Sequence, residues 1–204
     1  MKQLNLQKIQ TNLRNRFLKL GVKMVSPETI HFSNDTKIGK NVTIEPYVVF
    51  GAKVKIGKNV TIKSFSHLEN CKIENNVDVG PYARIRPGVI LKEGSKVGNF
   101  VEIKKSIIGK KSKVNHLAYV GDSDVGKSVN IGAGTITCNF DGKNKNKTKI
   151  GKNSFVGSNS TIIAPIKIGD NVTMGAGSVF NKDIPNNNLS IGRAYQINKK
   201  NKKN

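Results

Sequence analysis

The sequence has no tryptophan and few aromatic or acidic residues. Phe, Trp and Tyr make up 6% of the 204 residues, and 13 Asp and Glu stand against 35 Lys and Arg. The chain shows neither a recognition helix nor an aromatic stacking motif, so we expect no specific nucleic-acid partner. The net charge of +22 still favours anionic partners such as phosphates, although a general bias toward Lys and Asn, as in KNKNKTK at 143–149, explains it equally well.

The chain is also poor in cysteine and in long apolar runs. The two cysteines, Cys71 and Cys138, show no paired spacing, which excludes a disulfide framework and fits a reducing compartment. No apolar run approaches the ~20 residues that a membrane-spanning helix needs, and the first residues lack the apolar centre of a signal peptide. We therefore expect a cytoplasmic protein with no membrane span.

What the sequence does contain is a repeat of six residues. Glycine often follows the repeated apolar position, and a small or β-branched residue lies two positions before it. This period is neither helical nor that of a simple strand, so each hexad predicts a short strand and a corner, with the apolar residue pointing inward. Coils stacked ~4.8 Å apart would bury a continuous apolar column. The sequence thus predicts an all-β fold, a parallel β-helix. The repeated positions are Ile38, Ile44, Phe50, Ile56, Ile62, Leu68, Ile73, Val79, Ile85, Leu91, Val97, Ile103, Ile108, Val114, Val120, Val125, Ile131, Ile150, Val156, Ile162, Ile168, Met174 and Phe180.

Two segments flank the predicted β-helix of residues 26–184. Residues 1–25 are expected to form a short α-helical arm that ends near Gly21 and packs on the base of the β-helix or on a neighbouring subunit; a membrane-surface anchor is the alternative. Residues 185–204 are expected to form a basic C-terminal tail, disordered beyond Arg193. The apolar stripe of the arm consists of Leu6, Ile9, Leu13, Phe17 and Leu20.

The repeat is interrupted between residues 132 and 151, where GAGTITCNFDGKNKNKTKIG is expected to extrude a loop over 138–149. This segment resembles a signature of the acetyltransferase half of a bifunctional bacterial enzyme, the N-acetylglucosamine-1-phosphate uridyltransferase/glucosamine-1-phosphate acetyltransferase of the hexapeptide-repeat family. Three more segments share the likeness, which runs from about Gly21 through Arg193. They are ARIRPG at 83–88, VGNFVEIKKS at 97–106 and NHLAYVGD at 115–122.

The resemblance implies both an architecture and a reaction. It implies a left-handed β-helix that assembles as a homotrimer with active sites between subunits. It also implies acetyl transfer from acetyl-CoA to the amine of glucosamine 1-phosphate by direct attack, without a metal, in the synthesis of UDP-N-acetylglucosamine for peptidoglycan and lipopolysaccharide. No segment of this sequence matches the nucleotide-binding domain of the bifunctional enzyme, and we expect uridylyl transfer to be carried out by a separate uridyltransferase partner.

An amine that attacks a thioester must lose a proton, and histidine is the usual base near neutral pH. Of the three histidines, His31 and His67 lie outside the matched segments, whereas His116 matches the catalytic base of the family. We expect Glu102 to orient the His116 imidazole, with a purely solvent-facing role as the alternative. A covalent acetyl intermediate on Cys138 is the competing mechanism, but no histidine is adjacent to it in sequence.

The resemblance also implies substrate contacts. Arg86 and Lys104 match phosphate and sugar ligands, and Tyr119 and Asn130 match further sugar contacts, although Asn130 could instead face inward. The residues that match the acetyl-CoA site are Ala133, Asn139, Phe140, Lys145, Ser158, Ala176 and Arg193.

Two of these acetyl-CoA residues carry further implications. Lys145 matches a lysine that reaches the active site from a neighbouring subunit. Phe140 stands where the family usually has tyrosine, so any role that needs the hydroxyl group is in doubt.

Three rival functions remain for comparison. A γ-type carbonic anhydrase shares the fold but needs three histidines around zinc, and the histidines of this chain lack that motif. A hexapeptide acetyltransferase for another amino sugar, or for a nucleotide-linked amino sugar, would keep the chemistry and change the acceptor. A non-catalytic basic binding or assembly module would use only the charge.

Overall fold

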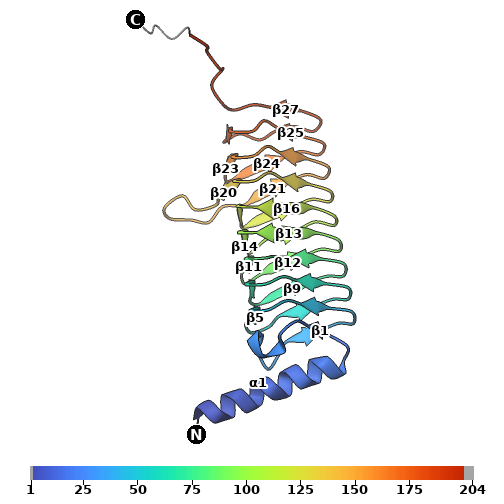
Figure 1. The fold of residues 1–204 in the computed structure, drawn as a ribbon. Coiled ribbons are helices and arrows are strands. Elements are labelled where there is room, and N and C mark those ends of the chain that lie inside the picture. Colours follow the sequence, from blue (N-terminus) through green and yellow to red (C-terminus); the bar gives the residue numbers. More distant parts are fainter. Residues whose placement is uncertain (1, 200–204) are drawn as a thin grey trace, which may run out of the picture.

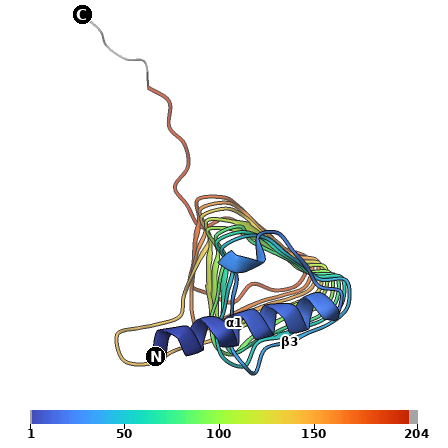
Figure 2. The same ribbon diagram turned by 60° about the horizontal axis from the view of Figure 1, so that its bottom comes forward.

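The computed structural model describes residues 2–199, with side chains from Asn5 onward, and shows a triangular prism closed at one end by a helix (Figures 1 and 2). The helix α1 spans Lys2–Lys19, and a short 3-10 helix spans Pro27–Thr29. The other elements are strands of two to four residues, one on each side of the prism in each coil. The predicted parallel β-helix is confirmed.

Three parallel sheets form the three faces of the prism. Face A contains β1 (Lys23–Met24), β4 (Thr43–Ile44), β7 (Thr61–Ile62), β10 (Asp78–Val79), β13 (Lys96–Asn99), β16 (Lys113–His116), β19 (Asn130–Ile131), β22 (Phe155–Val156), β25 (Thr173–Met174) and β27 (Leu189–Ser190). Face B contains β2 (His31–Phe32), β5 (Val49–Phe50), β8 (His67–Leu68), β11 (Arg84–Ile85), β14 (Glu102–Lys104), β17 (Tyr119–Gly121), β20 (Ile136–Cys138), β23 (Thr161–Ile163) and β26 (Val179–Phe180). Face C contains β3 (Lys37–Ile38), β6 (Lys55–Ile56), β9 (Cys71–Ile73), β12 (Val89–Leu91), β15 (Ile107–Ile108), β18 (Ser123–Val125), β21 (Thr148–Ile150) and β24 (Ile166–Ile168).

The repeated apolar residues fill the interior of the prism. All the predicted inward positions from Ile44 to Phe180 are buried, and only Ile38, near the base, stays partly exposed. The small or β-branched residues two positions earlier, such as Val60, Ser95 and Val129, are buried as well. Each hexad therefore contributes two inward side chains, and stacking the coils makes one continuous core.

The corners between faces use left-handed backbone conformations. At the corner between faces C and A, many of these positions are asparagine, a residue that tolerates a positive φ. Their side-chain amides also bond from coil to coil, as between Asn41 and Asn59 at 3.2 Å and between Asn59 and Asn76 at 3.0 Å. Part of the asparagine content thus has a structural cause, beyond a bias of composition.

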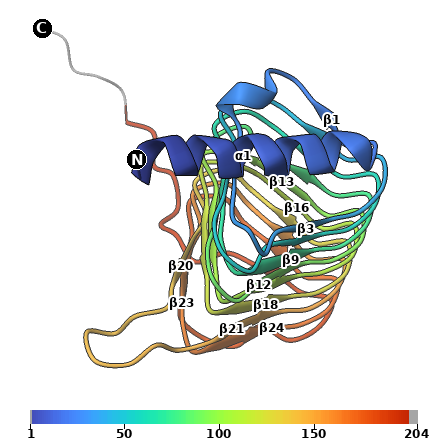
Figure 3. The same cartoon turned by 90° about the horizontal axis from the view of Figure 1, so that it is seen from below.

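Helix α1 lies across the open base of the prism (Figure 3). The Gln10 side chain bonds both the N–H and the C=O of Phe32, and the Nε of Arg14 donates to the C=O of Ile30. These contacts satisfy backbone groups of the first coil that have no coil beneath them. Of the predicted stripe, Ile9, Leu13 and Phe17 pack on the core.

The prediction for the arm was wrong at two positions. Leu6 and Leu20 are 61% and 55% exposed, because the buried stripe of α1 covers only the width of the prism interior. Strand β1 already pairs with β4, and β27 pairs with β25, so coil structure extends past residues 25 and 184. Those domain limits stay predictions. Residues 193–199 carry no helix or strand, and residues 200–204 of the predicted tail lie outside the described residues.

The interruption leaves the corner between faces B and C as a hairpin (Figure 3). Phe140 and Lys145 form an antiparallel bridge, and the N–H of Asn146 donates to the C=O of Asn139. At its tip, the Asp141 carboxylate accepts bonds from the N–H groups of Lys143 and Asn144 at 2.9 and 2.7 Å and from Asn146 Nδ2 at 2.9 Å. These bonds hold the pKa of Asp141 below its ordinary value. The extruded loop is therefore an ordered structure.

Candidate active site

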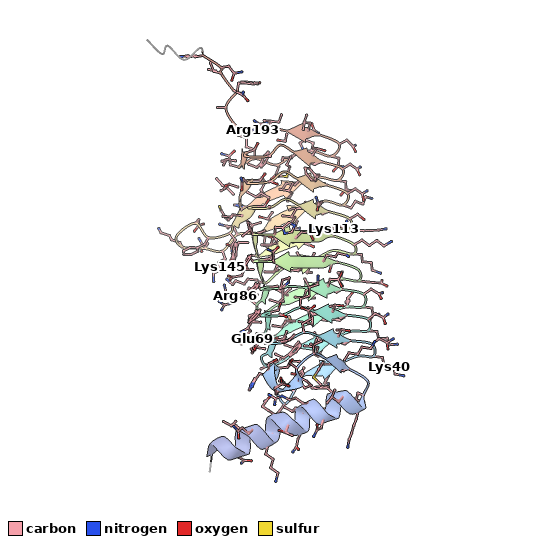
Figure 4. All side chains as sticks on the ribbon, viewed as in Figure 1. Lys40, Glu69, Arg86, Lys113, Lys145 and Arg193 are labelled. Carbon is pink, nitrogen blue, oxygen red and sulfur yellow. The ribbon has the colours of Figure 1, made fainter. Side chains whose placement is uncertain are left out.

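Most predicted sugar-site residues lie on the outer surface of face B. Glu102 pairs in register with Tyr119, and Lys104 pairs with Gly121 on the same two strands. The N–H of Arg86 donates to the C=O of Ile103, which places Arg86 one coil below Lys104. Arg86 and Lys145 lie on the same side of the prism, away from Lys40 (Figure 4).

The His116 imidazole is held by an asparagine one coil below it. Nδ1 of His116 lies 2.6 Å from Oδ1 of Asn99, its register partner on face A, and the imidazole is exposed to solvent. In the tautomer that donates from Nδ1 to this amide oxygen, the Nε2 lone pair stays free. That is the state in which a histidine accepts a proton.

Glu102 contacts Arg86 in the structure, whereas the sequence predicted a contact with His116. Oε1 of Glu102 accepts a bond from Nη1 of Arg86 at 2.7 Å, with both side chains about one third exposed. Glu102 lies one coil above the Arg84–Ile85 strand and within reach of the Arg86 guanidinium, whereas His116 ends its strand on the adjacent face. Glu102 therefore orients Arg86, and Asn99 is the partner of the imidazole.

Three cations gather beside these residues. The Lys104 ammonium has Lys145 and Arg86 as cationic neighbours, and its one nearby anion is the Asp122 carboxylate, with 3.9 Å between Nζ and Oδ2. The close approach of Lys145, followed by burial, lowers the pKa of Lys104 below its ordinary value. A cluster with excess positive charge is suited to a polyanion, because a bound phosphate would remove the repulsion.

Asp122 links this cationic cluster to the base of the hairpin. Its side chain is 11% exposed, and its Oδ2 accepts a bond from Asn139 Nδ2 while also facing Lys104. The hairpin then carries Lys145 back over Lys104 of the same chain. The contact between Lys145 and Lys104 lies within one chain. The match of Lys145 to a lysine that acts on a neighbouring subunit stays a prediction.

Tyr119 lies flat along its own strand. A Cβ atom built on Gly121 would collide with the Tyr119 ring and hydroxyl group, so the absence of a side chain at Gly121 leaves the space that the ring occupies. Gly121 is the register partner of Lys104. The phenol is thereby placed next to the cationic cluster, where it can donate to a sugar or phosphate oxygen.

Three of the residues matched to acetyl-CoA form a column above His116. The register of face A continues from Val114 to Ile131, Val156 and Met174, which puts Ala133, Ser158 and Ala176 in successive coils above the imidazole. Backbone bonds from Asn159 N to Ala133 O at 2.7 Å and from Gly177 N to Ser158 O at 2.8 Å hold this arrangement. At ~4.8 Å per coil the column rises ~14 Å from His116 to Ala176.

The upper end of this column is basic. Arg193 lies against Gly177, where a side chain would place its Cβ atom 3.9 Å from Arg193 Cδ. Small side chains along the column leave a clear surface for an extended pantetheine chain, and the guanidinium at its end suits a phosphate. The donor set therefore fits acetyl-CoA. Phe140, in contrast, is 58% exposed on the hairpin and forms no part of the column.

Asn130 stands apart from the other sugar-site residues. It points outward from β19 on face A, in register with Lys113 below and Phe155 above. Arg86, Lys104 and Tyr119 belong to face B. The alternative of an inward asparagine is thus wrong, and the predicted sugar site is divided between two faces of the prism.

Three polar residues of the site were missed from the sequence. Asn99 lies 17 positions before His116, one coil of this fold, and that spacing was the available signal. Asp122 is the last residue of the matched segment NHLAYVGD, and Asp141 lies inside the interrupted segment, so both were visible only as polar residues of those segments. In the described part of the chain, no group of three His, Cys, Asp or Glu side chains gathers as a metal site. No helix within residues 2–199 is both long and apolar enough to cross a membrane.

Comparison with protein families finds hexapeptide repeats. The family described as bacterial transferase hexapeptide (six repeats) matches residues 35–70 and 147–182, and the GMPPB C-terminal domain matches residues 67–140. Among solved structures, LpxA from Acinetobacter baumannii superposes with a TM-score of 0.69 and 20% identity, covering 80% of this chain and 68% of LpxA. This likeness shows the fold, and the predicted left-handed β-helix is confirmed.

The curated relatives are much more similar in sequence. The bifunctional protein GlmU of Zymomonas mobilis is 51% identical over 190 residues, which are 93% of this chain and 42% of that protein. The bifunctional protein GlmU of Rhizobium rhizogenes is 53% identical over 187 residues, 92% of this chain and 41% of that protein. The chain thus spans less than half the length of these relatives. It is a hexapeptide-repeat β-helix homologous, over more than nine tenths of its own length, to a part of the bifunctional protein GlmU.

Proposed function

We propose that this chain is a glucosamine-1-phosphate N-acetyltransferase that uses acetyl-CoA. The proposal is supported mainly by three features that lie close together in the structure. A histidine with a free Nε2, a cluster of cations and a column of small side chains all lie around His116. A base, an anion site and a surface for an extended thioester are what acetyl transfer to an amino sugar phosphate requires.

In the proposed mechanism the acceptor is held by face B. Arg86, oriented by Glu102, and Lys104 bind the phosphate, and Tyr119 bonds to the sugar. Acetyl-CoA supplies the activated acetyl group, lying along the column formed by Ala133, Ser158 and Ala176. Nε2 of His116 takes a proton from the amine as the amine nitrogen bonds to the thioester carbonyl carbon. The carbon–sulfur bond then breaks, and coenzyme A leaves as its thiol after receiving the proton from the His116 imidazolium.

The proposed setting follows from this chemistry. N-acetylglucosamine 1-phosphate is the precursor of UDP-N-acetylglucosamine, and the reaction is placed in the cytoplasm, where acetyl-CoA is available. We propose a homotrimeric assembly, as the resemblance implies. The direct test is to incubate purified protein with acetyl-CoA and glucosamine 1-phosphate and to measure the N-acetylated product by mass spectrometry. Absence of product at high protein concentration would favour a non-catalytic binding module.

We expect Asn99 to position the imidazole, because it is the bonded partner of Nδ1. Asn99→Leu should reduce kcat by about tenfold and leave KM for both substrates little changed. Asn99→Asp keeps an acceptor oxygen facing Nδ1 and should retain more of kcat than Asn99→Leu. Lys96→Met, on the same strand, is the control. Unchanged kcat in Asn99→Leu would remove Asn99 from the mechanism.

Lys145 should control the protonation of Lys104. Because the approach of Lys145 lowers the pKa of Lys104, Lys145→Gln is expected to raise it and to slow the acylation of Lys104 by a charge-sensitive reagent at pH 8. Peptide mass spectrometry would give the rate at Lys104. Lys143→Gln removes an exposed charge from the same hairpin and should leave that rate unchanged. Equal acylation rates in the Lys145 variant and the wild type would disprove the contact.

A further inference from the structure

One carboxylate lies between the acceptor side and the donor side of the proposed active site. Asp122 directly follows β17, and its Oδ2 accepts a hydrogen bond from Nδ2 of Asn139 at the base of the hairpin. The same oxygen lies 3.9 Å from Nζ of Lys104, and the side chains of Lys104 and Asp122 are only 14% and 11% exposed. Asn139 is buried as well. A single oxygen atom therefore faces a residue matched to each of the two substrates, largely shielded from water.

The backbone of this corner does not require a carboxylate. Asp122 has a φ of 47°, a left-handed conformation that asparagine and aspartate tolerate better than most residues. Its C=O accepts a bond at 3.3 Å from the N–H of Thr148, which follows the hairpin. The left-handed positions of the same corner in the four coils below are all exposed, and they are Lys53, Asn70, Gly88 and Lys105. Asp122 is thus the position of this series that the hairpin covers.

Burying this carboxylate costs free energy, because an ionised group loses its hydration when it leaves water. An asparagine at this position would suit the backbone and could still accept the bond from the hairpin, so neither requirement explains the negative charge. The charge does matter to Lys104, which has Lys145 and Arg86 as cationic neighbours. The Glu102 carboxylate is bonded to Arg86. Among the described residues, Asp122 is the carboxylate that pairs with the Lys104 ammonium.

The same carboxylate fixes the direction of the Asn139 amide. An ionised carboxylate only accepts hydrogen bonds, so it selects the amide orientation in which Nδ2 faces Asp122. Oδ1 of Asn139 is then left to accept a bond from an N–H group of the pantetheine chain. The Asn139 backbone is held separately, since its N–H donates to Thr137 at 3.0 Å and its C=O accepts from Asn146 at 2.7 Å. The hairpin thus sets the backbone of Asn139, and Asp122 sets its side chain.

We propose that Asp122 is a positioning residue of the acetyl-transfer site. Its carboxylate holds the Lys104 ammonium and the Asn139 amide in one arrangement, which places the acceptor phosphate and acetyl-CoA relative to each other. Asp122 acts through these two residues rather than on the reacting atoms. The role in acetyl transfer rests on the proposed function, whereas the contacts of Asp122 do not.

The first test replaces Asp122 by asparagine and needs no substrate. Asp122→Asn keeps a residue suited to the left-handed backbone and an oxygen that can accept the bond from Asn139. The negative charge of Asp122 raises the pKa of Lys104, so its removal should lower that pKa further. The neutral amine is the form that reacts with acetic anhydride. Acylation of Lys104 at pH 8, followed by peptide mass spectrometry, should therefore become at least ~3-fold faster.

Asp124→Asn is the matched control for this measurement. Asp124 is an exposed carboxylate two positions further along the chain, and its replacement should leave the acylation rate of Lys104 at the wild-type value. The change in Asp122→Asn is expected in the opposite direction to that in Lys145→Gln, because the two charges act on Lys104 with opposite sign. An unchanged rate in Asp122→Asn would overturn the proposal, since Lys104 would not then depend on the carboxylate.

The second test separates a positioning role from a structural one. In Asp122→Asn the alkaline limb of kcat/KM for glucosamine 1-phosphate should move to lower pH, because Lys104 would lose its proton at a lower pH. Asp122→Gly also suits the left-handed backbone but removes the oxygen that Asn139 uses. Its kcat should be about tenfold below that of Asp122→Asn, and its KM for acetyl-CoA should be higher. Lower thermal stability with wild-type kinetics in both variants would assign Asp122 a purely structural role and overturn the proposal.

The two tests also separate this inference from the proposed function. If the wild type transfers no acetyl group to glucosamine 1-phosphate, the proposed function fails, and acylation of Lys104 alone decides whether Asp122 controls its charge. If the wild type is active and the alkaline limb of Asp122→Asn stays at the wild-type pH, the positioning role fails while the proposed function stands. If Asp122→Gly does not fold, Asp122→Asn still supplies both the acylation rate and the pH profile.

Discussion

Replacing His116 by alanine is expected to reduce kcat for acetyl transfer by ~10²-fold or more, while folding and assembly stay intact. The loss follows from the proposed role of Nε2 as proton acceptor, since a positioned general base contributes roughly 10²–10⁴-fold. Because the His116 side chain is exposed and bonds only to Asn99 among the described residues, its removal should cost little stability. Steady-state thiol release from acetyl-CoA measures the rate, and thermal unfolding measures the stability.

His67→Ala is the matched control for this prediction. His67 is also an exposed strand residue, on face B in β8, but it lies outside the site. Its replacement should leave kcat within a factor of two of the wild type. Full turnover by His116→Ala would exclude His116 as the base and return attention to other groups around the cationic cluster.

Replacing Lys104 by glutamine is expected to raise KM for glucosamine 1-phosphate by about 10- to 100-fold. The estimate corresponds to a charge-assisted hydrogen bond of ~1.5–3 kcal/mol to the phosphate. KM for acetyl-CoA should change little, because the column above His116 does not include Lys104. An acceptor without a phosphate group should be used equally poorly by both proteins.

The direction of the change in stability caused by Lys104→Gln can also be predicted. A lysine whose pKa is lowered by folding opposes folding while it is charged, and the cost disappears only as the pH rises through the lowered pKa. Lys104→Gln removes the charge, so the variant should be at least as stable as the wild type at pH 7. Lys105→Gln, at the exposed neighbouring position, is the control and should keep the wild-type KM. A normal KM in Lys104→Gln would place the phosphate elsewhere.

The fold was largely predictable because each hexad of the sequence corresponds to one side of a coil, with its apolar residue pointing inward. Each inward position between Ile44 and Phe180 is buried as the period predicts. Within the repeat, Ile38 near the base is partly exposed. The other exceptions, Leu6 in α1 and Leu20 just after its last residue Lys19, lie outside the repeat, and which residues of this segment are covered depends on the width of the prism rather than on helical periodicity.

The site was predictable as a set of residues but not as a set of contacts. The matched segments contain Arg86, Lys104 and Tyr119. The structure places Lys104 and Tyr119 on adjacent strands of face B and Arg86 directly after the strand β11 below them. Glu102 was assigned to His116, yet it bonds Arg86, and Asn99 bonds the imidazole. Those contacts join residues of neighbouring coils, so they depend on which residues lie in register. Because some coils are one residue shorter than others, the register is known only once the coils are stacked.

The contacts of the hairpin also could not be predicted from the sequence. An extruded loop was expected from the interruption of the repeat, but its order comes from Asp141, which closes the tip, and from Asn139, which bonds Asp122 below. Nothing in the period of the sequence encodes these bonds. They bring Lys145 to Lys104 within one chain and so create the concentration of positive charge that the proposed acceptor requires.

The central claim is that the acceptor is glucosamine 1-phosphate, and its most direct test is thiol release from acetyl-CoA by the purified protein with three acceptors. These are glucosamine 1-phosphate, unphosphorylated glucosamine and UDP-glucosamine, each measured at equal concentration. We expect rapid release with glucosamine 1-phosphate and slow release with the other two, because the cations of face B recognise a terminal phosphate. Preference for UDP-glucosamine or for glucosamine would contradict the account and reassign the enzyme to another amino-sugar acceptor.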